Sequence, residues 1–151
     1  MPELKVLNNK EIKEVLKLIE GQWGAKVKLD YGFLRNNKGR VFVVSKDIAK
    51  INTSKLRLNS AGMYFCEIDS KGIRLSIEGS QIIGANASKN VVELNEGEAR
   101  KWFKGEDLEK NCEKCSGFLI IKHKNDFLGT GKYANGKIMN YVGKTRRVNV
   151  I

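Results

Sequence analysis

Closely spaced turn signals between short strand-like segments constrain the fold most, and they fill the end of the chain. The apolar run Phe118–Ile121 has the pattern of a buried strand. Turn signals follow at Asn125-Asp126, Gly129-Thr130-Gly131 and Asn135-Gly136, and Asn-Gly is the strongest two-residue hairpin signal. Short strands that reverse direction this often bury their apolar faces by curling into a barrel. We therefore expect a small β-barrel in the second half of the chain.

A different pattern, in which strands and a helix alternate, occupies the first half. A short strand is expected over residues 4–7, and Asn8 and Glu11 then have the spacing of a capping box at the start of a helix. Two hairpins are expected after this helix, over residues 31–45 and 63–77, because the turn-forming tetrapeptides NNKG and DSKG divide two pairs of apolar runs. This order indicates a small α/β domain.

The middle of the chain carries the expected junction. Residues 78–89 (EGSQIIGANASK) are small, polar and Gly-containing, which favours a short helix followed by a domain boundary. A strand over residues 91–94 and a helix from the cap Asn95 through Phe103 then open the second half, with Glu98 at the capping-box position.

Length and composition fit two small folded units. The chain has 151 residues, of which 41% are hydrophobic and 30% charged, and small domains of this size and composition bury a real core. We expect an α+β protein, with a small α/β N-terminal domain over residues 1–86 and the barrel domain over residues 87–151.

The charge balance indicates a polyanionic partner. There are 28 Lys and Arg against 17 Asp and Glu, a formal net charge of +11. From Gly117 to Ile151 seven basic residues accompany one acidic residue, Asp126. Neutralising phosphates releases counterions, so such a surface attracts RNA or DNA. Because no secretory signal pattern and no apolar run of about 18 residues is visible, we expect a cytoplasmic protein without a membrane partner.

Three stretches of the second half carry a family likeness: VVELNEGEARKWFKGEDL at 91–108, GFLIIKHKNDFLGTGKY at 117–133 and NGKIMNYVGKTRRV at 135–148. Together they resemble the PUA-like RNA-binding domain at the C-terminus of the Sun/Fmu-type ribosomal RNA cytosine-5 methyltransferases. One departure is Gly143, where the family pattern usually has proline before the lysine at 144.

The first half has a looser likeness, carried by GIRLSIEGSQIIG at 72–84. It resembles the small domain that precedes PUA in archaeal and eukaryotic ribosome-biogenesis proteins. The two resemblances together imply a pre-PUA α/β domain followed by a PUA-like β-barrel, without the methyltransferase body.

The resemblance implies that the helix ending near residue 105, the loop after it and the adjacent strand line an RNA groove. Flexible cations at intervals suit phosphates, whereas bases need stacking or polar edge contacts. Tyr133 and Tyr141 are candidates for stacking, with core packing as the alternative. The predicted RNA-binding residues are Lys101, Lys104, Gly105, Lys122, Lys124, Lys132, Asn140, Lys144, Arg146 and Arg147.

Motifs for catalysis or cofactor binding lack their required context. Residues 129–134 fit the dinucleotide pattern Gly-x-Gly-x-x-Ala, but a strand-like run follows instead of a helix, and the tyrosine after the lysine excludes a P-loop. Cys112 and Cys115 form one CxxC, with only Cys66 and His123 as further ligands, so we expect a plain loop rather than a zinc site or a redox pair. We expect no enzyme activity, no cofactor and no bound metal.

Three functions remain open from the sequence. The first is recognition of structured RNA, ribosomal or transfer RNA, by an accessory factor in ribosome biogenesis or RNA modification. The second is a protein-binding adaptor that recruits an RNA methyltransferase or assembly factor through its N-terminal domain. The third is an enzyme whose site has no recognisable motif.

Overall fold

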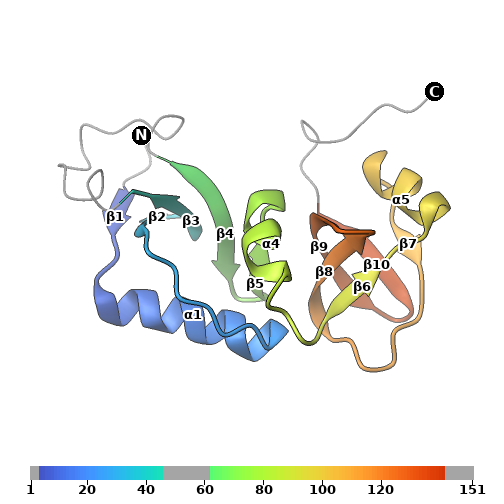
Figure 1. Ribbon diagram of the computed structural model, residues 1–151, viewed down its shortest axis with the longest axis horizontal. Helices are drawn as coiled ribbons and strands as arrows, with labels where there is room; N and C mark the ends of the chain where they lie inside the picture. The colour runs from blue at the N-terminus through green and yellow to red at the C-terminus, as the bar shows by residue number, and fades with distance from the viewer. Residues whose placement is uncertain (1–3, 46–61, 142–151) are drawn as a thin grey trace.

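The computed structural model describes residues 4–45 and 62–141. They form two five-stranded sheets that lie side by side along the long axis of the molecule, with helix α4 (Ile77–Gly84) between them (Figure 1). The expected α+β class is confirmed. No helix among these residues is long and apolar enough to cross a membrane.

The N-terminal sheet is an antiparallel meander in the order β1-β2-β3-β4-β5. The side-chain oxygen of Asn36 accepts hydrogen bonds from the backbone N–H groups of Lys38 and Arg40, at 3.0 and 2.9 Å, which closes the first hairpin. Both predicted hairpins are confirmed. The strands span Leu4–Val6 (β1), Gly32–Asn36 (β2), Arg40–Val44 (β3), Met63–Asp69 (β4) and Gly72–Leu75 (β5).

Helix α1 (Asn9–Trp23) lies along the lower side of the N-terminal sheet in Figure 1. The predicted capping box is present, because the Asn8 side chain accepts from the Glu11 N–H and the Glu11 carboxylate accepts from the Asn8 N–H. The helix ends at Gly24, whose φ of 66° is the left-handed conformation that glycine adopts readily. The buried face of α1 therefore ends at Trp23, which is fully buried.

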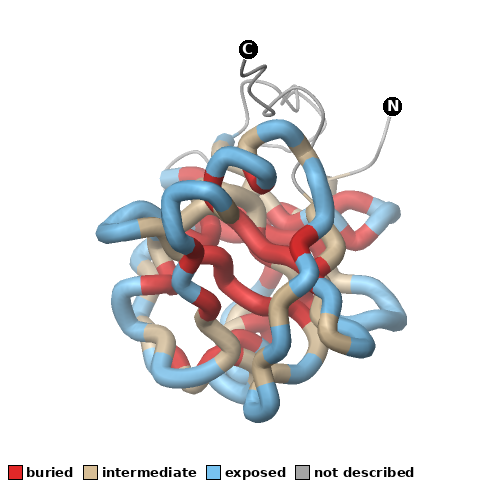
Figure 2. The backbone as a smooth tube through the Cα atoms, turned by 90° about the vertical axis from the view of Figure 1, so that its right-hand side faces the viewer, coloured by how far each residue is buried: buried red, intermediate tan, exposed pale blue. Residues whose placement is uncertain are grey.

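The C-terminal sheet has the order β6-β8-β9-β10-β7, and β6 runs parallel to β8. This sheet curls around a second core that helix α5 (Glu96–Phe103) covers (Figure 1). End-on, buried segments cross its middle and exposed turns form its rim (Figure 2). The strands span Val91–Glu93 (β6), Leu108–Glu109 (β7), Gly117–His123 (β8), Asp126–Ala134 (β9) and Lys137–Asn140 (β10).

The turn predicted at residues 129–131 is wrong, because these residues lie within strand β9. The turn at Asn135-Gly136 is confirmed, and both residues have positive φ, 51° and 75°. Gly131 is needed inside the strand for close packing. A Cβ atom there would lie 2.6 Å from Cη2 of Trp102 and 2.8 Å from the carbonyl oxygen of Met139.

The larger of the two cores is shared by both sheets, because β8 presents alternate side chains to different sides. Phe118 and Ile120 pack in the same cluster as Trp23, whereas Leu119 and Ile121 face the core under α5. This larger cluster is called the shared core below. The division into residues 1–86 and 87–151 remains a prediction, with the chain passing from α4 to β6 between them.

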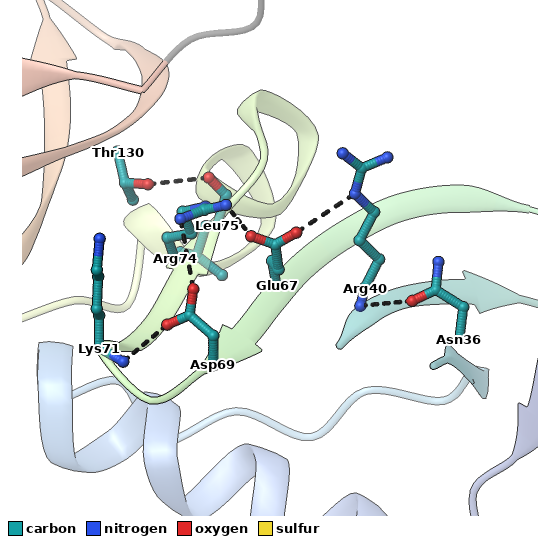
Figure 3. Close-up of polar contacts among 8 residues, drawn as sticks. All are labelled: Asn36, Arg40, Glu67, Asp69, Lys71, Arg74, Leu75 and Thr130. Atoms are coloured by element: carbon teal, nitrogen blue, oxygen red, sulfur yellow. Dashed lines mark hydrogen bonds and ion pairs between the residues drawn. The ribbon is translucent and has the colours of Figure 1, made fainter. Parts of the chain in front are cut away.

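Polar contacts also cross between the sheets. The indole N–H of Trp23 donates to the carbonyl oxygen of Phe118 at 3.0 Å. The Thr130 hydroxyl donates to the carbonyl oxygen of Leu75 at 3.0 Å (Figure 3), and the Gly129 N–H donates to the hydroxyl of Ser80 at 2.9 Å. Ser80 and Thr130 are buried, so the hydrogen bonds that they form are shielded from water. These bonds hold α4 and β5 against β9.

Cys66 is expected to resist alkylation until the protein unfolds. It is fully buried on β4, and burial raises the pKa of its thiol to about 12. Because the folded state keeps this proton while the unfolded chain loses it near pH 8.5, the free energy of unfolding should fall as the pH rises above that value. After the folded protein is reduced and alkylated, mass spectrometry should detect the label on Cys112 and Cys115 before it detects the label on Cys66. Equal rates at all three thiols would contradict the prediction.

Candidate nucleic-acid interface

Helix α5 brings several of the predicted RNA-binding residues together. Its capping box pairs Asn95 with Glu98, and the predicted end is confirmed at Gly105, whose φ is 88°. The N–H of Glu106 bonds to the carbonyl oxygen of Lys101 at 3.0 Å, so the chain leaves the helix in a tight left-handed turn. Lys101 and Lys104 are exposed on the last turn.

Asn140 joins this helix end to strand β10. Its side-chain amide donates to the carbonyl oxygens of Trp102, at 2.9 Å, and Glu106, at 3.2 Å. Its backbone N–H donates to the Asp107 carboxylate at 2.8 Å. Asn140 therefore lies beside Gly105, as the RNA groove expected from the sequence requires. Its amide nitrogen holds the loop at Gly105 in place.

The remaining described lysines lie elsewhere. Lys122 is near the end of β8, where its ammonium is 5.7 Å from the centre of the Phe127 ring, and Lys124 is exposed in the turn that follows. Lys132 pairs with Phe118 at the opposite end of the β8–β9 hairpin. It lies on the other face of the sheet from Asn140, because Asn140 pairs with the neighbouring residue.

Carboxylates accompany the lysines around α5. A surface hollow beside Lys101 is also lined by Glu98, Glu106, Asp107 and Glu109. Burial alone would raise the pKa of Glu98, but hydrogen bonds from the Asn95 N–H and from the lysine at 110 outweigh it and hold that pKa below its usual value. Ionised acids next to Lys101 weaken its attraction for phosphate.

The excess of positive charge in the described residues lies mainly on the N-terminal sheet and α1. Residues 4–45 contain nine basic and four acidic residues, whereas residues 87–141 contain ten basic and eight acidic ones. Three of the predicted RNA-binding residues, Lys144, Arg146 and Arg147, lie outside the described residues.

The aromatic and cysteine candidates have structural partners. The Tyr133 hydroxyl accepts a hydrogen bond from the N–H of Cys112 at 3.1 Å and donates to the side chain of Asn111 at 3.2 Å. Cys112 and Cys115 form a disulfide with Cα atoms 5.3 Å apart, so the plain loop expected there is wrong. Within the described residues, no group of His, Cys, Asp and Glu has the arrangement of a metal site.

Two arginines that were not selected from the sequence lie on the N-terminal sheet, and one of them, Arg74, lies where the two sheets meet. Arg40 and Arg74 both pair with Glu67 in Figure 3, from strands β3, β5 and β4. The strand registers bring Arg40, Glu67 and Arg74 together. Because these residues are up to 34 positions apart in the sequence, their contact could not be predicted from local patterns. Alternation of charged and apolar residues at Glu67-Ile68-Asp69 and Ile73-Arg74-Leu75 was the available signal for β4 and β5.

Comparisons with known proteins agree with the fold. Residues 89–148 match the family model described as the methyltransferase RsmF PUA domain. Ribosomal RNA small subunit methyltransferase F of Aeromonas salmonicida is 28% identical over 131 residues, 87% of this chain and 27% of that protein. The same-named Vibrio cholerae protein is 28% identical over 86 residues, 57% of this chain and 18% of that protein.

The chain thus spans about a quarter or less of the length of these curated relatives. Among solved structures, a conserved PUA domain protein from Thermoplasma acidophilum has a TM-score of 0.61 and 13% sequence identity, covering 94% of this chain and 95% of that one. The predicted PUA-type fold is therefore confirmed. The C-terminal part of the chain is similar to the PUA domain of RsmF methyltransferases, and the chain as a whole has the fold of a PUA domain protein.

Proposed function

We propose that this protein binds structured RNA, ribosomal or transfer RNA, as a non-enzymatic accessory factor in ribosome biogenesis or RNA modification. The match of residues 89–148 to the RsmF PUA domain carries the proposal, and the net charge of +11 supports it. The proposed location is the cytoplasm. Proposed partners besides RNA are a modification enzyme or an assembly factor.

The predicted cations do not contribute equally to this proposal. Lys101 and Lys124 share their surface hollows with carboxylates, which lower the local positive potential. Lys132 lies over an aromatic ring, 5.8 Å from the centre of Phe118. We therefore expect the largest losses of affinity from Lys132 and from the basic segment that contains Arg146 and Arg147.

RNA affinity should fall steeply as salt rises. With roughly four to six phosphate contacts, each contributing about 0.7–0.9 to the logarithmic slope, affinity should drop by about two to three orders of magnitude between 50 and 200 mM salt. Fluorescence anisotropy with a labelled structured RNA measures this slope. A flat response would overturn electrostatic RNA binding.

Charge reversal distinguishes RNA binding at the proposed site from attraction by the net charge of the protein. Arg146→Glu with Arg147→Glu should weaken binding and reduce the salt slope by about 1–2, one contact for each cation lost. The matched control is Lys10→Glu with Lys17→Glu, which changes the net charge equally on the exposed side of α1. Equal weakening by both double variants would contradict the site, whereas circular dichroism checks that each variant folds.

A further inference from the structure

Arg40 presents a guanidinium group to solvent from the N-terminal sheet, a part of the chain that the RsmF domain model does not cover. Its Nε lies 3.4 Å from the Glu67 carboxylate, and Figure 3 shows its two terminal nitrogens pointing away from Glu67. Its side chain is 55% exposed. The guanidinium carbon also lies 5.8 Å from the centre of the Tyr64 ring, so an aromatic side chain supports it from beneath.

Arg74 repeats this arrangement at the meeting of the two sheets. It pairs with Glu67, which is only 11% exposed, and with Asp69 at 3.7 Å. Its guanidinium carbon lies 5.1 Å from the centre of the Tyr141 ring. Because Glu67 is held between two arginines, it fixes both guanidinium groups, and together with Asp69 it balances their charges.

The same alternation of ring and cation continues onto the C-terminal sheet. The Tyr141 and Phe118 rings meet at an angle of 64°, with centres 5.4 Å apart. The Lys132 ammonium lies 5.8 Å from the centre of the Phe118 ring. We call this series of contacts the seam strip; it consists of Arg40, Tyr64, Arg74, Tyr141, Phe118 and Lys132, of which Phe118 is buried and connects Tyr141 to Lys132.

The chemistry of the seam strip fits unpaired nucleotides. A base in a duplex has both faces covered by its neighbours, whereas an unpaired base can stack on an aromatic ring or on a guanidinium plane. An arginine lying on a tyrosine offers its free face to a base and its edge to a phosphate, which a lysine cannot do. Cations placed at both ends of the strip suit the phosphates of a strand that crosses it.

We propose that the seam strip binds a single-stranded RNA segment next to the structured element that the PUA domain recognises. Arg40 stacks on a base and Lys132 contacts a phosphate, so both sheets hold the RNA. This inference rests on the proposed RNA-binding function, and it adds the unpaired flank as the substrate and the N-terminal sheet as part of the site.

Two RNA probes test the proposal: a hairpin with a single-stranded extension and the same hairpin with a blunt end. Wild-type protein should prefer the extended probe, and Arg40→Gln should weaken that binding about tenfold while leaving the blunt probe nearly unchanged. Arg40→Lys should restore the salt slope but not the affinity, because the charge returns without the planar group. Lys38→Gln, in the exposed turn just before Arg40, is the matched control and should bind both probes normally.

Other outcomes overturn the proposal in distinguishable ways. Equal weakening of both probes by Arg40→Gln would mean general phosphate attraction, and no weakening would exclude Arg40 from the site. If the blunt probe binds as well as the extended one, and polyglutamate binding depends on Arg40, the strip serves an acidic protein instead. Failure of wild-type protein to bind either probe would overturn the proposed function itself.

Discussion

Replacing Trp23 with alanine should lower the free energy of unfolding by about 3–5 kcal/mol, the usual cost of removing a large buried aromatic side chain. Trp23 is fully buried at the end of α1, and its indole N–H bonds to Phe118 on β8. The substitution removes both the packing and one of the polar contacts between the sheets. Thermal denaturation followed by circular dichroism should show a fall in Tm of about 6–20 °C for a chain of this length.

Two further variants separate the contribution of the Trp23 hydrogen bond from that of its burial. Trp23→Phe keeps most of the ring and loses only the N–H, and the Phe118 carbonyl still accepts a bond of 2.8 Å from the Gln22 side chain, so about 1 kcal/mol should be lost. Leu18→Ala, on the same helix but 47% exposed, should change stability by less than about 0.5 kcal/mol. A loss from Leu18→Ala as large as that from Trp23→Ala would contradict burial as the cause.

The shared core also predicts that the two sheets unfold together. In Trp23→Phe the remaining tryptophan is Trp102, which reports on the C-terminal core. Its fluorescence transition should coincide with the transition in circular dichroism, as in a two-state process. Separate transitions would instead support two independent domains, divided near residue 86.

Local signals in the sequence were sufficient for the helices and hairpins. The capping boxes at Asn8 and Asn95 and the turn at Asn36–Gly39 need only neighbouring residues to form, and the structure contains all three. The resemblance to PUA also identified the fold class, because the motifs around Gly105 and Asn140 occur in the right order. These features depend on contacts between residues that are close in sequence or on recognised motifs.

Long-range pairing could not be predicted in the same way. The parallel pairing of β6 with β8 and the contact of Arg74 with Tyr141 join residues far apart in sequence. No local pattern showed that Phe118 would face the N-terminal core rather than the barrel. The candidate site was therefore predicted as a C-terminal groove, and the arginines that we propose on the N-terminal sheet were not selected.

The glycines of β9 show how a local signal can mislead. Gly129 and Gly131 have the composition of a turn, but Gly131 is buried opposite Trp102 because no side chain fits between the strand and α5. Glycine inside a strand often marks such a close approach. The distinction depends on α5 lying over β9, which cannot be read from the residues of β9 alone.

Gly131→Val should therefore destabilise the protein by about 3 kcal/mol through overpacking. The new Cβ would meet Trp102 and Ile138 at 2.6 and 2.7 Å, and both side chains are fully buried, so neither can move aside without opening the core. Valine favours strands, which rules out a weak strand propensity as the cause. Urea denaturation measures the loss, and Gly131→Ala should give a smaller loss of the same sign.

Gly97→Ala is the matched control on α5, because the nearest atom to its new Cβ is the Asn95 side-chain oxygen at an ordinary 3.6 Å. It should leave stability unchanged or raise it by up to about 1 kcal/mol. Gly131→Val should also weaken RNA binding below its Tm, since displacing Trp102 disturbs the carbonyl that holds Asn140 and with it the loop at Gly105. Normal RNA affinity in a destabilised but folded Gly131→Val protein would place the RNA site away from α5 and leave the seam strip as the stronger candidate.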